Sequence, residues 1–329
     1  MPRLALPKPH AGRLKDWLEF SQRQYDSLDY DPFHPILWHL QKGLPKEAAL
    51  WSSTLYMAWY NIGSFYLAFH ASDPLTTPPV WTAKLPIGVQ RRNLRGGKVL
   101  QHLADFSEKA RAAGGIKKFL TQGFGADRAK NWGLLTETLR SVWGNGRWSV
   151  YTLGELYQKV NKLPVLPTDI MNDGSSGPRT GLCYLHDCEL DDIRKLDKLA
   201  DRLFLCAWPR LKTKIPYLAR NHYDFGMMES QLCDFNSLRK GRYYVGRDID
   251  RDQERLRAAE VAASGIPESS YTLRYLRDVY SARAKVFDHR YLGEFNGWLG
   301  RTEYANRYYV KTGKIADHRE IREALGCLF

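Results

Sequence analysis

Apolar residues recur at intervals of three and four along most of this chain, and this helical period limits the possible folds more than any other feature. The alternating pattern that predicts strands is scarce. The expected fold class is therefore mostly α. Helices are predicted over residues 13–26, 46–70, 93–113, 127–143, 148–162, 189–206, 226–238, 248–263, 270–286 and 315–325.

Length and composition favour one compact unit. The chain has 329 residues, of which 43% are hydrophobic, enough for one large domain or two modest ones. Because no long Pro, Gly or Ser linker marks a boundary, a single compact domain is predicted over residues 1–329. The most apolar stretch, residues 48–71, is interrupted by Asn61 and Gly63. It predicts a buried core helix rather than a membrane span, so no membrane partner is expected.

The cysteines indicate a reduced, intracellular protein. There are five of them, an odd number, and no signal peptide precedes them. Cys183 and Cys188 flank His186, but this spacing is not that of a usual zinc pair. A zinc site is therefore not expected.

The charge of the chain favours a polyanionic partner. Lys and Arg number 49 against 36 Asp and Glu, which gives a formal net charge of +13. Aromatic residues make up 13% of the chain, and several of them follow an arginine directly, as in Arg147-Trp148. Base stacking with phosphate contacts would explain this pairing in a nucleic-acid-binding protein. A generally basic soluble protein with aromatic core residues is the alternative.

A glycine turn at residues 143–149 (WGNGRWS) lies between two predicted helices. A helix that begins after such a turn presents free backbone N–H groups and the positive end of its dipole, which suits a phosphate. The alternative is an interhelical turn with a glycine C-cap. The candidate DNA-binding residues are Asn145, Gly146, Arg147 and Trp148.

A second glycine-rich segment, residues 174–182 (GSSGPRTGL), follows Asp169, which itself lies 23 residues after Gly146. Glycine and serine in a loop can form a nest of N–H groups for an anion, and an arginine adds a planar grip on phosphate oxygens. A plain surface turn is the alternative. The candidate phosphate-binding residues are Gly174, Ser175, Ser176, Gly177 and Arg179.

Three motifs follow one another along the chain: residues 29–37 (DYDPFHPIL), residues 174–182, and residues 228–235 (MESQLCDF) followed by Arg239-Lys240-Gly241-Arg242. In this order they resemble the motifs of the alpha-glutamyl/putrescinyl thymine pyrophosphorylase group of bacteriophages, also called amino acid:DNA transferases. The group is in turn similar to helix-hairpin-helix DNA glycosylases. The resemblance therefore implies a glycosylase-like helical fold, with the hairpin and loops at about residues 127–242. The chain lacks the glycosylase lysine at the turn and the four-cysteine cluster, which argues against base excision.

The resemblance implies a specific reaction. Its substrate would be DNA that contains pyrophosphorylated 5-hydroxymethyluracil, flipped out of the helix so that its methylene can react. An amine would be joined to that C5 methylene and pyrophosphate released, giving hypermodified thymine. The reaction needs donors for the leaving group and a carboxylate as base. Asp169 is the first candidate for the base, because the hairpin analogy places a carboxylate there, and Glu229 is the second.

The amine donor is an amino acid or a polyamine. The basic residues Arg239, Lys240 and Arg242 favour a donor with a carboxylate, and the many aromatic residues favour a small one such as glycine. The same basic residues would equally suit a DNA phosphate. No cofactor is required, although a divalent metal stays open. A DNA glycosylase and a non-catalytic basic DNA-binding protein are the alternatives, and a phage protein of this kind is expected in the host cytoplasm.

Overall fold

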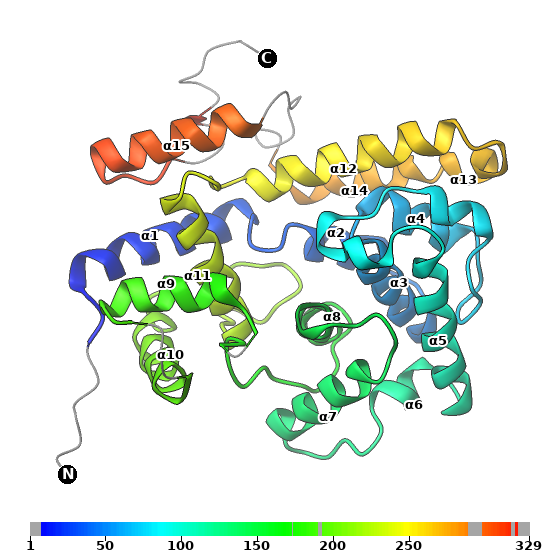
Figure 1. The fold of residues 1–329 in the computed structure, drawn as a ribbon, viewed down its shortest axis with the longest axis horizontal. Helices are drawn as coiled ribbons and strands as arrows, with labels where there is room; N and C mark the ends of the chain where they lie inside the picture. Colours follow the sequence, from blue (N-terminus) through cyan, green and yellow to red (C-terminus); the bar gives the residue numbers. More distant parts are fainter. Residues whose placement is uncertain (1–7, 173, 190–192, 289–297, 317–319, 322–329) are drawn as a thin grey trace. The chain divides into compact units, whose positions relative to one another are not determined.

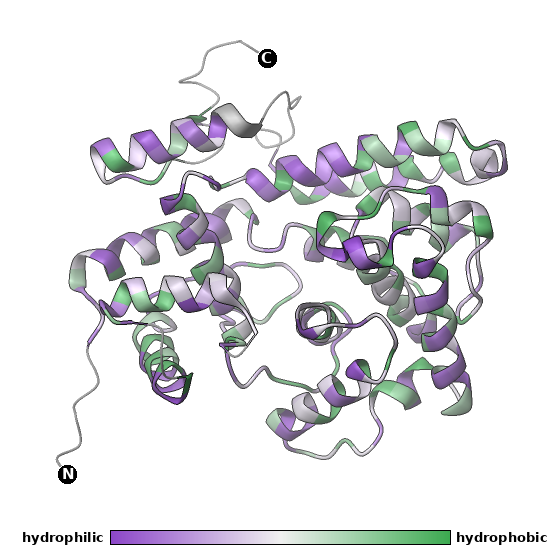
Figure 2. Cartoon of the chain, viewed as in Figure 1, coloured by the Kyte–Doolittle hydropathy of each residue, from purple (hydrophilic) through white to green (hydrophobic). Residues whose placement is uncertain are grey.

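The structure, a computed structural model, describes residues 8–172, 174–189, 193–288, 298–316 and 320–321. Within these residues the chain consists of α-helices and short 3-10 helices joined by turns, and it contains no strand (Figure 1). The mostly α fold class is therefore confirmed, whereas the likeness to helix-hairpin-helix glycosylases stays a prediction. Hydrophilic and hydrophobic residues alternate around most helices (Figure 2), as expected where one helix face is buried.

The helices fall into two compact units, and the single domain predicted over residues 1–329 stays a prediction. Unit 1 takes in residues 1–32, 167–250 and 287–329, and unit 2 takes in residues 33–166 and 251–286. The helices of unit 1 are α1 (Ala11–Ser27), α9 (Ser176–His186), α10 (Ile193–Ala207), α11 (Phe225–Arg239) and α15 (Trp298–Thr312). Helix α12 (Arg247–Ser264) begins in unit 1 and continues in unit 2.

Unit 2 contains the remaining helices, and its core forms around α3, where residues 50–59 are all buried. Thr54 of α3 shares a 2.7 Å hydrogen bond with the Tyr157 hydroxyl of α8. Gly154 of α8 lies so close to α7 that a Cβ there would be 2.8 Å from the Trp132 ring. The α-helices of unit 2 are α2 (Phe33–Leu40), α3 (Lys46–Trp59), α4 (Ile62–His70), α5 (Lys98–Ala112), α6 (Ile116–Leu120), α7 (Arg128–Arg140), α8 (Arg147–Lys159), α13 (Ser270–Leu273) and α14 (Leu276–Val286).

The structure divides two predicted helices and adds others. The helix expected over residues 270–286 is the two helices α13 and α14. The helix expected over residues 46–70 is two helices, because Tyr60 adopts a left-handed conformation with φ of 48° and Asn61 starts a new helix. The Asn61 side chain accepts hydrogen bonds from the N–H groups of Gly63 and Ser64, a typical N-cap. Helices α2, α9 and α15 were not predicted, and the helix expected over residues 315–325 lies largely outside the described residues.

Helix α9 is the most consequential of these additions, because the sequence predicted a loop there. It packs against α11 through two glycines one turn apart. A Cβ on Gly177 would lie 2.6 Å from Cys233 Sγ, and a Cβ on Gly181 would lie 2.4 Å from the Leu232 carbonyl oxygen. Both distances are far shorter than any side chain tolerates, so these two positions need glycine if the helices are to approach this closely.

Within the described residues, no helix combines the length and the apolar character that crossing a bilayer requires.

Replacing Gly181 with alanine tests the close contact of α9 with α11. The new methyl group would meet backbone of α11, which cannot move aside as a flexible side chain can. We expect Gly181→Ala to lower the free energy of unfolding by about 1–3 kcal/mol. Gly133→Ala on α7 is the matched control, since a Cβ there meets nothing within 4 Å; it should be neutral or stabilise by up to about 1 kcal/mol. Urea unfolding measures the free energy of unfolding of both variants. Equal values for the two would contradict the close contact of α9 with α11.

Candidate functional site

The start of α9 is shaped to receive an anion. The N–H groups of Gly174 and Ser175 both donate to the Met171 carbonyl at 2.9 Å, which turns the chain into the helix. Ser175 is the N-cap, with extended backbone, and no side chain among the described residues caps this helix end. Gly174 and Ser176 are exposed. The first turn of α9 therefore directs backbone donors and the positive end of the helix dipole outward.

Arg179 lies in this first turn and folds back toward the preceding segment. Its Nη1 donates to the Asn172 carbonyl at 3.5 Å, a long hydrogen bond. Its Nε is buried and has no hydrogen-bond partner within the described part of the chain. Since a guanidinium has five donors, this one long hydrogen bond uses little of the hydrogen-bonding capacity of Arg179.

Cys233 lies against the start of α9, and charged side chains surround it. Burial, together with the carboxylates of Asp234, Glu229 and Asp248, raises the pKa of the Cys233 thiol, while the Arg247 guanidinium opposes this. A protonated thiol is a poor nucleophile, so Cys233 acts as a small buried side chain here. Cys233, together with the carboxylates and the guanidinium around it, forms what we call the Cys233 cluster: Cys233, Glu229, Asp234, Arg247 and Asp248.

Asp234 is the member of the Cys233 cluster whose environment is best defined. Its Oδ2 accepts a 2.9 Å hydrogen bond from Gln24 Nε2 of α1, its one hydrogen-bond partner among the described residues. Burial and the Asp248 carboxylate raise the pKa of Asp234, although the Gln24 bond and Arg247 act in the opposite direction. The residue is partly exposed. A carboxylate with a raised pKa and a solvent-reachable side holds a proton more readily than an ordinary carboxylate and suits proton transfer.

Asp29 connects the N-terminal motif to this cluster. Its buried carboxylate accepts a 2.6 Å hydrogen bond from the Tyr243 hydroxyl and a 2.7 Å bond from the Gly246 N–H. It also accepts the N–H groups of Asp248 and Ile249, at 3.1 and 3.2 Å, and so caps the start of α12 from a distant part of the sequence. Burial and the Asp248 carboxylate raise the pKa of Asp29, against the effect of these hydrogen bonds.

Gln24 joins these two carboxylates. Its Nε2 donates to Asp234 and, at 3.1 Å, to the hydroxyl of Tyr243, which in turn donates to Asp29. The Arg247 guanidinium lies 5.3 Å from the centre of the Tyr243 ring. The side chains of α1, α11 and α12 are thereby held in one continuous network.

Of the two predicted bases, only Glu229 belongs to the Cys233 cluster. It is half-buried on α11, one turn before Cys233. Asp169 is exposed in the loop before α9, and its Oδ1 accepts the Met171 N–H at 2.7 Å, which is the geometry of an Asx turn. The catalytic roles of both residues stay predictions.

The basic segment at residues 239–242 lies at the C-terminal end of α11. Arg239 lies over the Tyr184 ring, with its guanidinium carbon 3.1 Å from the ring centre, and Arg13 lies 4.4 Å from the same centre. Gly241 has a φ of 67° and ends the helix. Lys240 and Arg242 are exposed and remain candidates for substrate or DNA contacts.

The glycine turn predicted to bind DNA lies in unit 2, between α7 and α8. Gly144 has a φ of 82°, a conformation that favours glycine, and Gly146 is the N-cap of α8 without a capping side chain among the described residues. Arg147 is exposed at the first position of α8. Trp148 packs edge-on against the Tyr60 ring, with centroids 4.9 Å apart, so its ring is committed to a contact within unit 2.

Internal hydrogen bonds hold this turn in place. Asn145 Nδ2 donates to the Leu139 carbonyl at 3.0 Å, so its side chain has a structural role. The Trp143 N–H donates to Asp105 at 2.7 Å, and the Trp143 carbonyl lies 2.5 Å from His102 Nδ1. Burial and the nearby Arg91 guanidinium lower the pKa of His102 to about 4. His102 is therefore neutral in the folded protein at neutral pH.

Sequence reasoning missed four residues of the site: Asp29, Asp234, Arg247 and Asp248. Asp29 and Asp234 lie in the motifs that carried the family resemblance, and this could have drawn attention to them. Arg247 and Asp248 lie in no such motif. Among the described residues, no group of three or more His, Cys, Asp or Glu side chains is arranged to hold a metal ion.

The buried His102 predicts a loss of stability in acid. Its pKa is about 4 when folded and about 6.5 when unfolded, so below pH 6.5 the unfolded chain binds a proton that the folded protein excludes. The free energy of unfolding should fall by roughly 3 kcal/mol from this residue between pH 6.5 and 4. His102→Asn keeps a donor for the Trp143 carbonyl but does not titrate. Urea titrations should show a shallower pH dependence for the variant, and parallel curves would exclude this role.

The comparison with protein families agrees with the motifs. Residues 88–244 match a family described as amino acid:DNA transferase. This range includes the glycine turn, Asp169, the start of α9 and all of α11, whereas Asp29 and Arg247 lie outside it. A comparison with curated proteins found no match. The family resemblance predicted from the sequence is thus confirmed over residues 88–244, which are similar to the amino acid:DNA transferases, a name that denotes a transferase acting on DNA.

Proposed function

We propose that this protein joins an amine to the C5 methylene of pyrophosphorylated 5-hydroxymethyluracil in DNA. In this reaction the nitrogen lone pair attacks the methylene carbon, and the carbon–oxygen bond breaks with its electron pair leaving on pyrophosphate. The proton that the amine nitrogen loses passes to a carboxylate. The product is a hypermodified thymine. The observation that carries the proposal is that the start of α9 and the Cys233 cluster lie against each other in unit 1.

The start of α9 supplies the donors for the leaving group. Charge that gathers on departing pyrophosphate needs preorganised donors, and a helix N-terminus together with an arginine provides them. Arg179 lies in the first turn of this helix, and its Nη1 contacts the Asn172 carbonyl just before it. The residues assigned to pyrophosphate are Gly174, Ser175, Ser176, Gly177 and Arg179.

The Cys233 cluster supplies the base. An amine is protonated at neutral pH and must lose a proton before it attacks, which a carboxylate of raised pKa can accept. Asp234 has such a raised pKa, and Glu229 lies beside Cys233 in the same cluster, whereas Asp169 is exposed and already caps a turn. The carboxylates also attract the ammonium of the incoming donor. We therefore assign Glu229 and Asp234 as the leading candidates for the base and keep Asp169 as the alternative.

DNA binding and donor recognition complete the proposal. Arg147 and the start of α8 would contact a DNA phosphate, and the reacting base would be flipped into the site. Exposed Lys240 and Arg242 would recognise the carboxylate of an amino-acid donor, and a small amino acid such as glycine is favoured over a polyamine. A divalent metal that assists pyrophosphate departure stays an open part of the proposal, as does action in the cytoplasm of a phage-infected host.

Nucleoside mass spectrometry tests the reaction directly. DNA that contains pyrophosphorylated 5-hydroxymethyluracil would be incubated with the protein and glycine, glutamate or putrescine, then digested to nucleosides. We expect a thymidine adduct with the mass of the amine and one equivalent of pyrophosphate, formed only when both substrates are present. Abasic sites would instead identify a DNA glycosylase, and binding without any new nucleoside would identify a non-catalytic DNA-binding protein.

Isosteric variants assign the base within the same assay. Asp234→Asn and Glu229→Gln keep shape but remove a proton acceptor, and loss of the base should slow transfer by about 100-fold or more in at least one of them. Asp169→Asn is the comparison, and it should retain most activity. DNA affinity and helix content should stay unchanged in all three. Full activity of the two cluster variants with an inactive Asp169→Asn would return the role to Asp169.

The proposed phosphate contact at the glycine turn can be tested separately by DNA affinity. If Arg147 pairs with a phosphate, Arg147→Ala should weaken binding to all DNA sequences alike and reduce the slope of log affinity against log salt by about 1. Lys118→Ala, at another exposed position of unit 2, is the matched control and should change neither quantity by as much. Fluorescence anisotropy over a salt series measures both. An unchanged slope for Arg147→Ala would exclude this phosphate contact.

A further inference from the structure

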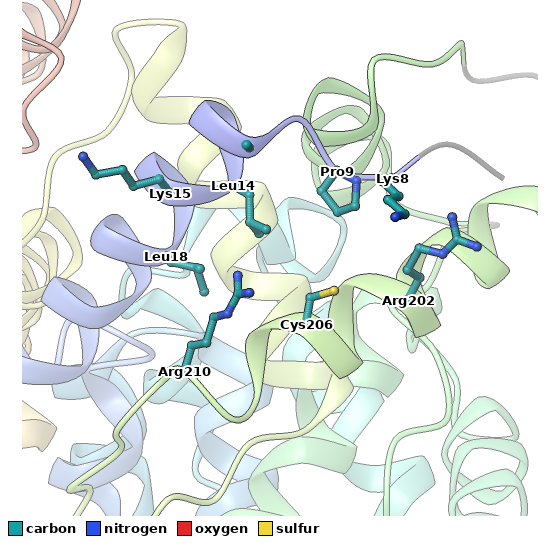
Figure 3. A pocket seen from close by; sticks show the side chains of 9 residues that line it. Lys8, Pro9, Leu14, Lys15, Leu18, Arg202, Cys206 and Arg210 are labelled. Carbon is teal, nitrogen blue, oxygen red and sulfur yellow. The ribbon is translucent and has the colours of Figure 1, made fainter.

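Unit 1 contains a second candidate binding site, a pocket between α1 and α10 that is separate from the Cys233 cluster. Its volume is about 690 Å³, within the range of ligand pockets. Leu14 and Leu18 of α1 and Cys206 of α10 provide an apolar floor (Figure 3). We call this the α1–α10 pocket.

Four cationic side chains surround this floor. Lys8 and Lys15 come from the start of the chain and from α1, Arg202 comes from α10, and Arg210 from the turn that follows it (Figure 3). No acidic residue lines the pocket within the described part of the chain. Ala11, the first residue of α1, also lines it, so the positive end of that helix dipole lies close by. The electrostatic character of the pocket is therefore uniformly positive.

We propose that the α1–α10 pocket binds the sugar–phosphate backbone of DNA. The cations would pair with successive phosphates, and a deoxyribose would rest on the aliphatic floor. The proposal rests on the proposed function only in taking DNA as the substrate. It adds a DNA contact in unit 1 that is independent of the glycine turn.

The residues that line the pocket favour the DNA backbone over a flipped DNA base as the ligand. Pockets that receive a flipped base use aromatic or planar stacking surfaces and hydrogen-bond acceptors, and no aromatic or carboxylate side chain lines this pocket within the described residues. Phosphate contacts from Lys and Arg, by contrast, are the commonest contacts in protein–DNA complexes. An anionic lipid headgroup has the same phosphate chemistry, so the experiment must distinguish it.

Charge reversal at two exposed rim positions provides the test. Lys15→Glu/Arg210→Glu should lower affinity for unmodified duplex DNA by about tenfold or more at low salt, and reduce the salt slope by about 2. Lys198→Glu/Lys214→Glu is the matched control. It makes the same change in net charge at exposed positions of unit 1 outside the pocket. The control should lose much less affinity.

Each other outcome overturns the proposal. Equal losses in the two double variants would show that net charge, not the pocket, governs binding. Unchanged DNA affinity in Lys15→Glu/Arg210→Glu, with lost binding to phosphatidylserine vesicles, would make the pocket a lipid site. Because the assay uses unmodified DNA and requires no turnover, its failure is distinguishable from failure of the transferase reaction.

Cysteine footprinting gives a second measurement on the unaltered protein. Cys206 lines the pocket and is half-buried, and Cys188 is half-buried outside it. Bound DNA should slow alkylation of Cys206 by N-ethylmaleimide several-fold more than that of Cys188, as followed by peptide mass spectrometry. Equal protection of the two cysteines, or none, would contradict occupation of the pocket by DNA.

Discussion

The contact of α9 with α11 is the constraint on which the rest of the candidate site depends. Gly177 and Gly181 bring the two helices so close that a methyl group at either position would overlap Cys233 or the backbone at Leu232. This approach places the positive end of α9 beside the carboxylates that surround Cys233. The proposed reaction, in which a phosphate group leaves and an ammonium must first lose a proton to become the attacking amine, would need both kinds of charge within one site. The two glycines therefore bring these opposite charges together, because they permit the close approach of the two helices.

A buried polar network connects α11 to α1 and to the start of α12. Asp29 caps the start of α12 with both carboxylate oxygens, and Tyr243 and Gln24 extend the network to Asp234. Since a buried carboxylate is costly unless its oxygens are satisfied, each member limits the positions of the others. Burial and the nearby Asp248 carboxylate raise the pKa of both Asp29 and Asp234. The one with access to solvent, Asp234, is the one suited to exchange protons with a substrate.

DNA contacts are proposed at two places with different physical characters. The glycine turn offers backbone donors at the start of α8. It is held by the Trp143 N–H, which donates to Asp105, and by the Trp143 carbonyl, which contacts His102. The α1–α10 pocket offers long cationic side chains around an apolar floor. The first fixes a phosphate by geometry and the second by charge and shape. Both proposed contacts use positive charges of the chain, but the net charge alone does not indicate where on the protein DNA would bind.

The sequence by itself determined the helical fold class, the polyanionic partner expected from the charge, and the family, since periodicity, composition and short ordered motifs are local properties. It also located the glycine turn, because a left-handed φ at Gly144 is a local demand. Only the tertiary structure decided that residues 176–186 form a helix, because their glycines are tolerated through contact with α11. It likewise decided that Asp29, Asp234 and Asp248 meet. They lie up to 219 residues apart in the chain, and no local pattern records a contact made by folding.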